Sequence, residues 1–119
     1  MNKKRTGFTC GSFDIVHWGQ IEMLEECKQI CDYLIVGLQT DPTIDRPEKN
    51  KPIHSSEERK KVLEAIKYID EIIIYDSEKD LYNLLKKLLN EKRIDVRIMG
   101  ADWKGKKFTG YDLPIPIYF

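Results

Sequence analysis

The residues from Gly11 to Gln20 have the types and spacing of a phosphate-binding turn at the start of a helix. Gly11 follows a short apolar segment, and a glycine at that point lets a ligand approach the backbone closely. Gly19 would lie in the first helical turn, where unpaired N–H groups attract anions. His17 at the helix start is positioned to donate a hydrogen bond to phosphate, and Gln20, three residues on, shares its helical face.

Neither common fingerprint of a nucleotide-binding loop is present. The chain lacks G-x-G-x-x-G after its first apolar segment and G-x-x-x-x-G-K-[ST] throughout, so we expect neither a dehydrogenase nor a P-loop enzyme. Its 20 basic and 20 acidic side chains give a formal net charge of zero. Because no overall charge attracts nucleic acid or an anionic membrane surface, any anion site must be built locally.

The elements that must position this turn alternate regularly along the chain. Short apolar segments predict strands at residues 6–10, 33–38, 72–75 and 96–99, with a fifth at 115–119 that Pro114 and Pro116 weaken. Helical spacing predicts helices at residues 18–31, 55–69 and 77–93, and Ser55 with Glu58 forms a capping box.

This alternation implies right-handed crossovers and a Rossmann-like, three-layer α/β/α fold with a parallel sheet. We expect the strand order 3-2-1-4-5, with the first strand central and Gly11 at its carboxyl end. Ligands in such sheets bind beyond the carboxyl ends of the strands. Three segments follow strand ends and are therefore the places to look for chemistry: residues 11–17, 39–54 and 100–110.

The three cysteines invite a metal hypothesis that the rest of the sequence does not favour. Zinc sites usually need four Cys or His ligands, and the two histidines, His17 and His54, lie in very different contexts. Cys27 and Cys31 fall on the apolar face of their predicted helix, where free cysteine behaves as a small hydrophobe. We therefore expect buried thiols and no metal site.

The length of 119 residues suits a single domain, which we expect to span residues 1–119. The basic start Met1 to Arg5 is not followed by the unbroken apolar run of a signal peptide, and no stretch approaches membrane-spanning length. These features predict a cytoplasmic protein.

At the level of motifs the sequence resembles the glycerol-3-phosphate cytidylyltransferase family, within the wider nucleotidyltransferase group whose first turn carries G-T/S-F-D-x-x-H-x-G-H. The resemblance extends from Thr9 nearly to Trp103. The matching motifs stand in the family's order: Gly11-Ser12-Phe13-Asp14, His17-Trp18-Gly19, His54-Ser55, Arg59-Lys60, Tyr68 with Asp70-Glu71, and Met99-Gly100 with Asp102-Trp103.

This resemblance implies attack by glycerol 3-phosphate or a similar small alcohol phosphate on the α-phosphorus of CTP, giving a CDP-alcohol and pyrophosphate. A phosphate nucleophile is already anionic, so positioning and charge stabilisation suffice without a general base. Mg²⁺ would arrive with CTP rather than occupy a protein cage. The resemblance also implies a homodimer and neither a nucleic-acid nor a membrane partner.

The same resemblance suggests which side chains act. His17 would contact the triphosphate, Lys51 or Lys49 would neutralise phosphate charge, and Arg59 would lie near the phosphates. The catalytic set is then His17, Gln20, Lys51 and Arg59. The nucleotide-binding set is Thr9, Gly11, Ser12, Phe13, Asp14, Gly19, Lys49, Lys67, Gly100, Asp102 and Trp103.

Some of these residues have simpler interpretations. Without the motif context, Arg59 and Lys60 near the start of a helix are typical of solvated charges. Trp18 and Trp103 suit packing as well as base stacking.

Two departures from the family pattern bear on turnover. Gln20 replaces the family's second histidine and can donate a hydrogen bond but cannot carry a positive charge. We also expect the domain to lack the family's C-terminal R-T-E-G-I-S segment, which closes over the triphosphate. A smaller change is Lys67, where the family has arginine.

Three hypotheses therefore stand: a working cytidylyltransferase, a nucleotide-binding module with weak or lost catalysis, and an adenylyltransferase of the same wider group. Residues 67–72 and 100–103 favour cytidine.

Overall fold

The structure, a computed structural model, describes residues 5–49, 51–100 and 103–119. Asp102, expected near the nucleotide, lies outside these residues. The strands are β1 (Thr6–Gly11), β2 (Tyr33–Gln39), β3 (Glu71–Tyr75), β4 (Val96–Ile98) and β5 (Ile117–Tyr118). The α-helices are α1 (Trp18–Ile30), α2 (Ser56–Glu64) and α3 (Glu78–Asn90), and a 3₁₀ turn, η1 (Pro42–Ile44), lies in the connection from β2 to α2.

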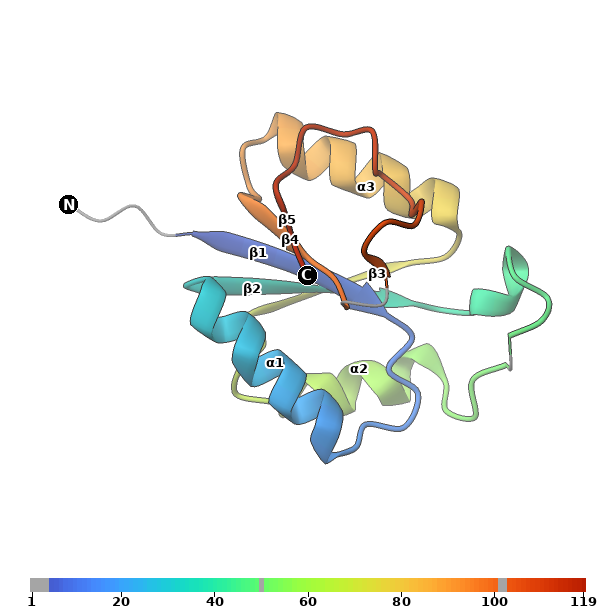
Figure 1. The fold of residues 1–119 in the computed structure, drawn as a ribbon. Coiled ribbons are helices and arrows are strands. Elements are labelled where there is room, and N and C mark those ends of the chain that lie inside the picture. Colours follow the sequence, from blue (N-terminus) through green and yellow to red (C-terminus); the bar gives the residue numbers. More distant parts are fainter. Residues whose placement is uncertain (1–4, 50, 101–102) are drawn as a thin grey trace.

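The strands form one parallel sheet in the order β3-β2-β1-β4-β5, as predicted. β1 and β2 pair along their whole lengths, from Thr6 opposite Tyr33 to Gly11 opposite Leu38. Helices α1 and α2 cover one face of the sheet and α3 covers the other (Figure 1). β1 is therefore the central strand, and Gly11 lies at its carboxyl end.

The sheet separates two apolar cores. On the face of α1 and α2, Leu24, Cys27 and Leu63 pack against β2. On the face of α3, Leu81, Leu85 and Leu88 pack against Phe8 and Ile35. Cys27 and Cys31 are free thiols with 1% and 5% exposure, which confirms their prediction as buried hydrophobes.

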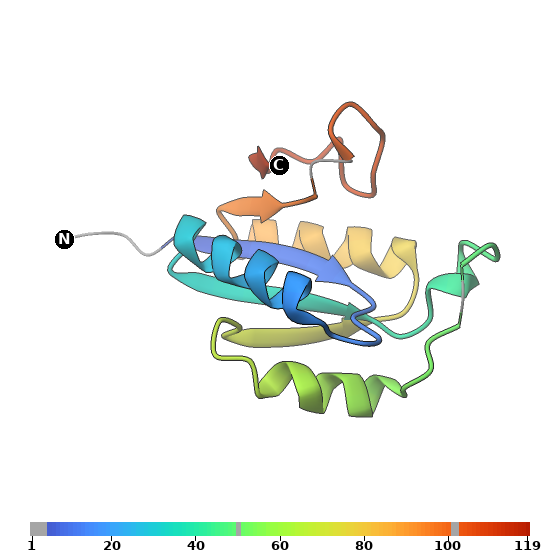
Figure 2. The same cartoon turned by 60° about the horizontal axis from the view of Figure 1, so that its bottom comes forward.

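Local signals place the helix starts accurately. Ser55 and Glu58 form the predicted capping box of α2, and Ser77 with Asp80 forms the same arrangement at α3. β5 is only two residues long, shorter than predicted, because prolines precede it and cannot donate to the ladder. The connection from β2 to α2 projects beyond the carboxyl edge of the sheet (Figure 2).

Gly37 in the middle of β2 allows a close approach on the α3 face. A Cβ atom there would lie 2.8 Å from Cζ of Phe8 and 3.1 Å from Cβ of Cys10. It would also lie 3.2 Å from Cε1 of Tyr75. The missing side chain therefore lets Cys10 and Tyr75 come together near the ends of their strands.

Among the helices of the described residues, none is long and apolar enough to cross a membrane.

Candidate active site

A cleft of about 820 Å³ lies over the carboxyl ends of the strands. Its floor contains Gly11 and Ser12 after β1, Gln39 at the end of β2, Tyr75 at the end of β3, and Gly100 after β4. All three segments expected from the strand ends contribute to it. The position agrees with the general rule for ligand sites in open parallel sheets.

The residues that line the cleft come from both faces of the sheet, and we call the two groups the limb beside α1 and the limb beside α3. The limb beside α1 is mainly apolar and is lined by Met23, Glu26, Cys27, Ile30 and Ile98. Trp103 also lines the cleft, and it shares a smaller hollow with Arg46, Glu78 and Phe108. The limb beside α3 is polar and contains cations, and it is lined by Cys10, Arg46, Lys49, Tyr75, Glu78, Arg97 and Phe108. The two limbs therefore offer different chemistry to their occupants.

Six of the residues predicted for the site line this cleft. They are Thr9, Gly11, Ser12, Lys49, Gly100 and Trp103. They come from the ends of β1 and β4 and from the long connection after β2. The other predicted residues that the structure describes do not line the cleft, and their positions are given below.

His17 is the N-cap residue of α1, and its ring orientation is fixed. The imidazole Nδ1 accepts a hydrogen bond of 3.1 Å from the backbone N–H of Gly19. In the neutral ring the proton must then be on Nε2, which leaves Nε2 as a donor. The side chain is exposed and does not line the cleft, so Nε2–H has no competing partner among the hydrogen bonds of the described residues.

Gln20 completes the cap from the other side. Its Oε1 accepts a hydrogen bond of 3.3 Å from the backbone N–H of His17, so the pair forms a capping box. Gly19 has a role different from the predicted one. A Cβ atom there would lie 2.9 Å from Cε1 of His17, so the absent side chain makes room for the imidazole.

Arg59 in the first turns of α2 is 2% exposed, so its interpretation as a solvated charge is wrong. Its guanidinium donates to four backbone carbonyls. Nη1 reaches Ser12 O at 2.9 Å and Gln39 O at 2.6 Å, Nη2 reaches Thr40 O at 2.5 Å, and Nε reaches His54 O at 3.0 Å. Burial lowers the pKa of this guanidinium, while the Asp14 and Asp41 carboxylates act in the opposite direction.

These contacts give Arg59 a structural role that the sequence did not predict. Its hydrogen bonds tie the turn after β1 to the connection after β2, and both segments line the cleft. Arg59 is therefore a positioning residue in this structure.

Asp14 and Phe13 help to fix the turn after β1. The Asp14 carboxylate accepts hydrogen bonds of 2.8 Å from Ile53 N and 2.9 Å from His54 N, and these bonds lower its pKa. Phe13 has a positive φ of 46°, and its ring is buried in the core beneath α1. Neither side chain lines the cleft as predicted, and both fasten the loop that does.

Two predicted lysines lie outside the cleft lining. Lys67 precedes β3 and lies at the amino end of that strand, with its Nζ 5.3 Å from the Tyr68 ring centroid. That end of the sheet is opposite the cleft, so within one chain Lys67 does not reach the site. Lys51 is exposed in the β2–α2 connection and contributes to the lowered pKa of Asp41, after the larger effect of the Thr43 hydrogen bonds.

Apart from Lys49, the polar residues of the α3 limb were not predicted. Arg97 is the clearest case. A cation inside the apolar segment 96–99 indicates a buried charge, and buried charges are rare unless they have a partner. Arg46 and Glu78 lie 32 residues apart and form an ion pair of 3.1 Å that only the fold creates.

We predict that Arg59→Lys destabilises the domain by about 2–4 kcal/mol, because lysine cannot satisfy four backbone carbonyls that lie in different directions. Urea unfolding followed by circular dichroism measures this change. Lys61→Met on the exposed side of the same helix is the matched control and should change stability by less than about 0.5 kcal/mol. Equal stability of Arg59→Lys and the unmodified chain would contradict the role assigned to Arg59.

Comparison with known proteins places the chain in a family. Residues 8–110 match the cytidylyltransferase-like family. Glycerol-3-phosphate cytidylyltransferase of Bacillus subtilis is 44% identical over 98 residues, which are 82% of this chain and 72% of that protein. The bifunctional protein HldE of Campylobacter concisus is 37% identical over 112 residues, which are 93% of this chain and 23% of that protein.

A solved structure shows the same architecture. The lipopolysaccharide core biosynthesis protein of Thermoplasma volcanium superposes with a TM-score of 0.73 at 26% sequence identity, covering 97% of this chain and 94% of that one. The family match covers both the His17 turn and the residues of β4 that border the cleft. The chain therefore belongs to the cytidylyltransferase-like family, and it is a nucleotidyltransferase.

Proposed function

We propose that this chain transfers the cytidylyl group of CTP to a small alcohol phosphate, with glycerol 3-phosphate as the first candidate. An oxygen of the phosphate monoester attacks the α-phosphorus of CTP and forms a new P–O bond. The bond between the α-phosphorus and the bridging oxygen breaks, and pyrophosphate leaves with that electron pair. The observation that carries this proposal is the 44% identity to a glycerol-3-phosphate cytidylyltransferase over 82% of this chain.

The two limbs suit two different substrates. We assign the nucleoside of CTP to the limb beside α1, where the apolar side chains of Met23 and Ile98 can pack against a base. The triphosphate then lies near the junction of the limbs, within reach of His17 and the turn after β1. Asp102 is part of this proposal through the motif alone.

Charge stabilisation is the main chemical task of such a site, because an anion attacks an anion. The Nε2–H of His17 and the Lys49 ammonium at the cleft are the groups proposed to meet the triphosphate, with Lys51 entering from the same connection. Mg²⁺ arrives as the CTP complex, since the triphosphate oxygens supply ligands that this ion prefers.

We predict that the chain releases pyrophosphate and forms a CDP-alcohol when given CTP, Mg²⁺ and a panel of alcohol phosphates, with mass spectrometry as the measurement. CTP should also raise the melting temperature more than ATP does, because a ligand bound to the native state stabilises it by mass action. Equal or greater protection by ATP, with an ADP-alcohol as product, would instead support an adenylyltransferase. Binding of CTP without any product would support a nucleotide-binding module.

Gln20 offers a sharper test of catalysis. We predict that Gln20→His raises kcat by up to about tenfold and changes CTP affinity less than twofold, because a charged donor is stronger where negative charge grows in the transition state. Single-turnover kinetics and CTP titration separate the two quantities.

The matched variant for this test is His17→Asn. Asparagine is a strong N-cap residue and can keep α1 capped, whereas the Nε2 donor is lost. Its kcat should fall by about 10²–10³ while the melting temperature stays close to that of the unmodified chain. A kcat that His17→Asn leaves unchanged would remove His17 from the proposed machinery.

We also propose a homodimer. Within the described part of the chain, the edge strand β3 pairs only with β2, and it carries Ile74 with 42% exposure. Apolar side chains on an open strand edge favour pairing with a second copy. Light scattering at micromolar concentration should give about twice the mass of the 14.0 kDa chain, and a single species at the chain mass would contradict the proposal.

A further inference from the structure

Arg97 is a buried cation without an acidic partner among the residues that the structure describes. It is 3% exposed, and its guanidinium donates hydrogen bonds from Nη1 to the carbonyl of Thr109 and from Nη2 to Cys10 Sγ at 4.0 Å. The guanidinium also lies 5.1 Å from the Phe108 ring centroid. A guanidinium has five N–H donors, so these contacts leave hydrogen-bonding capacity unused.

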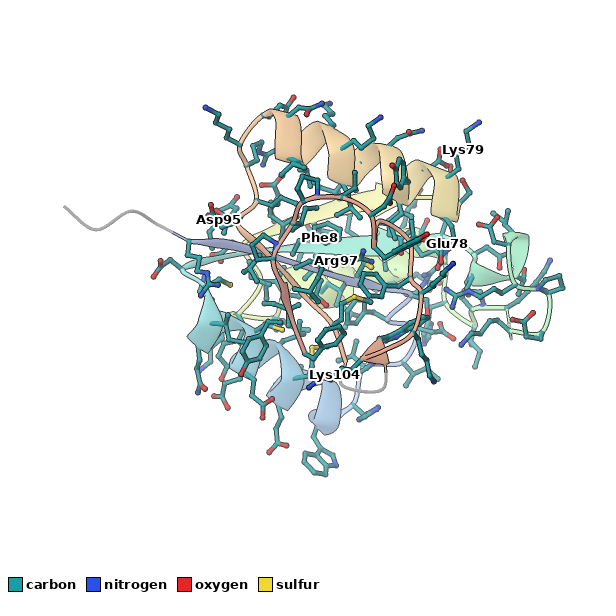
Figure 3. The ribbon with its side chains drawn as sticks, turned by 45° about the horizontal axis from the view of Figure 1, so that its top comes forward. Phe8, Glu78, Lys79, Asp95, Arg97 and Lys104 are labelled. Carbon is teal, nitrogen blue, oxygen red and sulfur yellow. The ribbon has the colours of Figure 1, made fainter. Side chains whose placement is uncertain are left out.

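A buried charge normally has a counter-charge, because removal from water is otherwise costly. Arg97 lines the α3 limb of the cleft, so the missing counter-charge can be supplied by a ligand there. Figure 3 shows Arg97 in the middle of the molecule, beneath the connection from β4 to β5, with Glu78 at the start of α3 nearby. Arginine suits an anion with paired oxygens, such as phosphate or carboxylate.

A second feature of this limb concerns Arg46 and Glu78. The two side chains form one ion pair, between Arg46 Nη2 and Glu78 Oε1, but Arg46 Nε and Glu78 Oε2 are buried atoms without a hydrogen-bond partner. One is a donor and the other an acceptor. A hydroxyl group can satisfy both kinds of atom, and an unsatisfied buried polar atom in a binding limb indicates a ligand group.

We infer that Arg97 binds the phosphate of the acceptor, and that Arg46 and Glu78 select an acceptor that carries a hydroxyl group beside its phosphate monoester. This inference rests on the proposed function for the identity of the second substrate. Arg97 holds the attacking phosphate on the α3 side of Gly11 and Ser12, while CTP lies on the α1 side. The cation also reduces the repulsion between the two anionic substrates as they approach each other.

The kinetic test compares Arg97→Met with Lys79→Met, which removes an exposed cation in the first turn of α3 that points away from the molecule (Figure 3). Arg97→Met should raise the KM for glycerol 3-phosphate about ten- to hundredfold and leave the KM for CTP within twofold. Lys79→Met should change neither constant by more than twofold. An equal rise in both KM values for Arg97→Met would show a merely structural role and overturn the inference.

Two further variants and substrates sharpen the result. Arg97→Lys keeps one charge without the paired donors, so its KM for glycerol 3-phosphate should lie between those of the unmodified chain and Arg97→Met. The unmodified chain should prefer glycerol 3-phosphate to propyl phosphate, and Glu78→Gln should reduce that preference. A preference that Glu78→Gln leaves unchanged would overturn the assignment of the hydroxyl contact.

A binding assay decides the matter without catalysis and thereby separates this inference from the proposed function. Cys10 lies beside Arg97, and its alkylation by iodoacetamide can be followed by mass spectrometry with buried Cys27 and Cys31 as internal references. Burial raises the pKa of the Cys10 thiol, so the reaction is run at about pH 8.5 to increase the thiolate fraction.

Inorganic phosphate and glycerol 3-phosphate should each slow alkylation of Cys10 in the unmodified chain. Arg97→Lys should need at least about tenfold more of either probe for the same protection, and this variant preserves the test if Arg97→Met fails to fold. Unprotected Cys10 in the unmodified chain, or equal protection in the variant, would overturn the anion site. Protection without any CDP-alcohol product would instead reject the proposed function and retain the anion site.

Discussion

The guanidinium of Arg59 is the interaction on which the shape of the cleft depends. Parallel strands end with carbonyl groups that have no partner beyond the sheet, and the loops that follow them would otherwise separate. One planar group with donors in several directions satisfies the carbonyls of Ser12, Gln39, Thr40 and His54 together. A local turn cannot do this, because the acceptors belong to segments that are up to 47 residues away in sequence.

Asp14 strengthens the same junction with an acceptor instead of a donor, since its carboxylate binds the N–H groups of Ile53 and His54. The two charges thus fasten opposite kinds of backbone group on neighbouring loops. Phe13 anchors the turn from below, where burial of its ring holds a backbone with positive φ in place. In the motif Gly11 to Asp14, Gly11 and Ser12 therefore line the cleft, while the side chains of Phe13 and Asp14 hold this turn in place.

The fold could be predicted from the sequence because its signals are local. Apolar segments without alternation marked the strands, and Ser55 and Ser77 marked two helix starts through their capping partners. Residues at the site were harder to assign, because a charged side chain has no local signature of its partner. Arg59 and Arg97 are both buried for reasons that arise from distant carbonyls and loops. The position of Lys67, by contrast, could have been predicted. Lys67 comes just before β3, and the amino ends of parallel strands lie on the side of the sheet away from the ligand site.

The two faces of the sheet explain how one small domain can treat two anionic substrates differently. Side chains alternate along β4, so Ile98 joins the core beneath α1 whereas Arg97 lies on the side of α3. A single register therefore gives the α1 limb an apolar wall and the α3 limb a buried cation. Moving β4 by one residue would exchange these two environments and leave the charge in the core beneath α1. In the proposed reaction, the strict period of the strand, together with the loops joined by Arg59, would thus give each side of the reacting phosphorus its own chemistry.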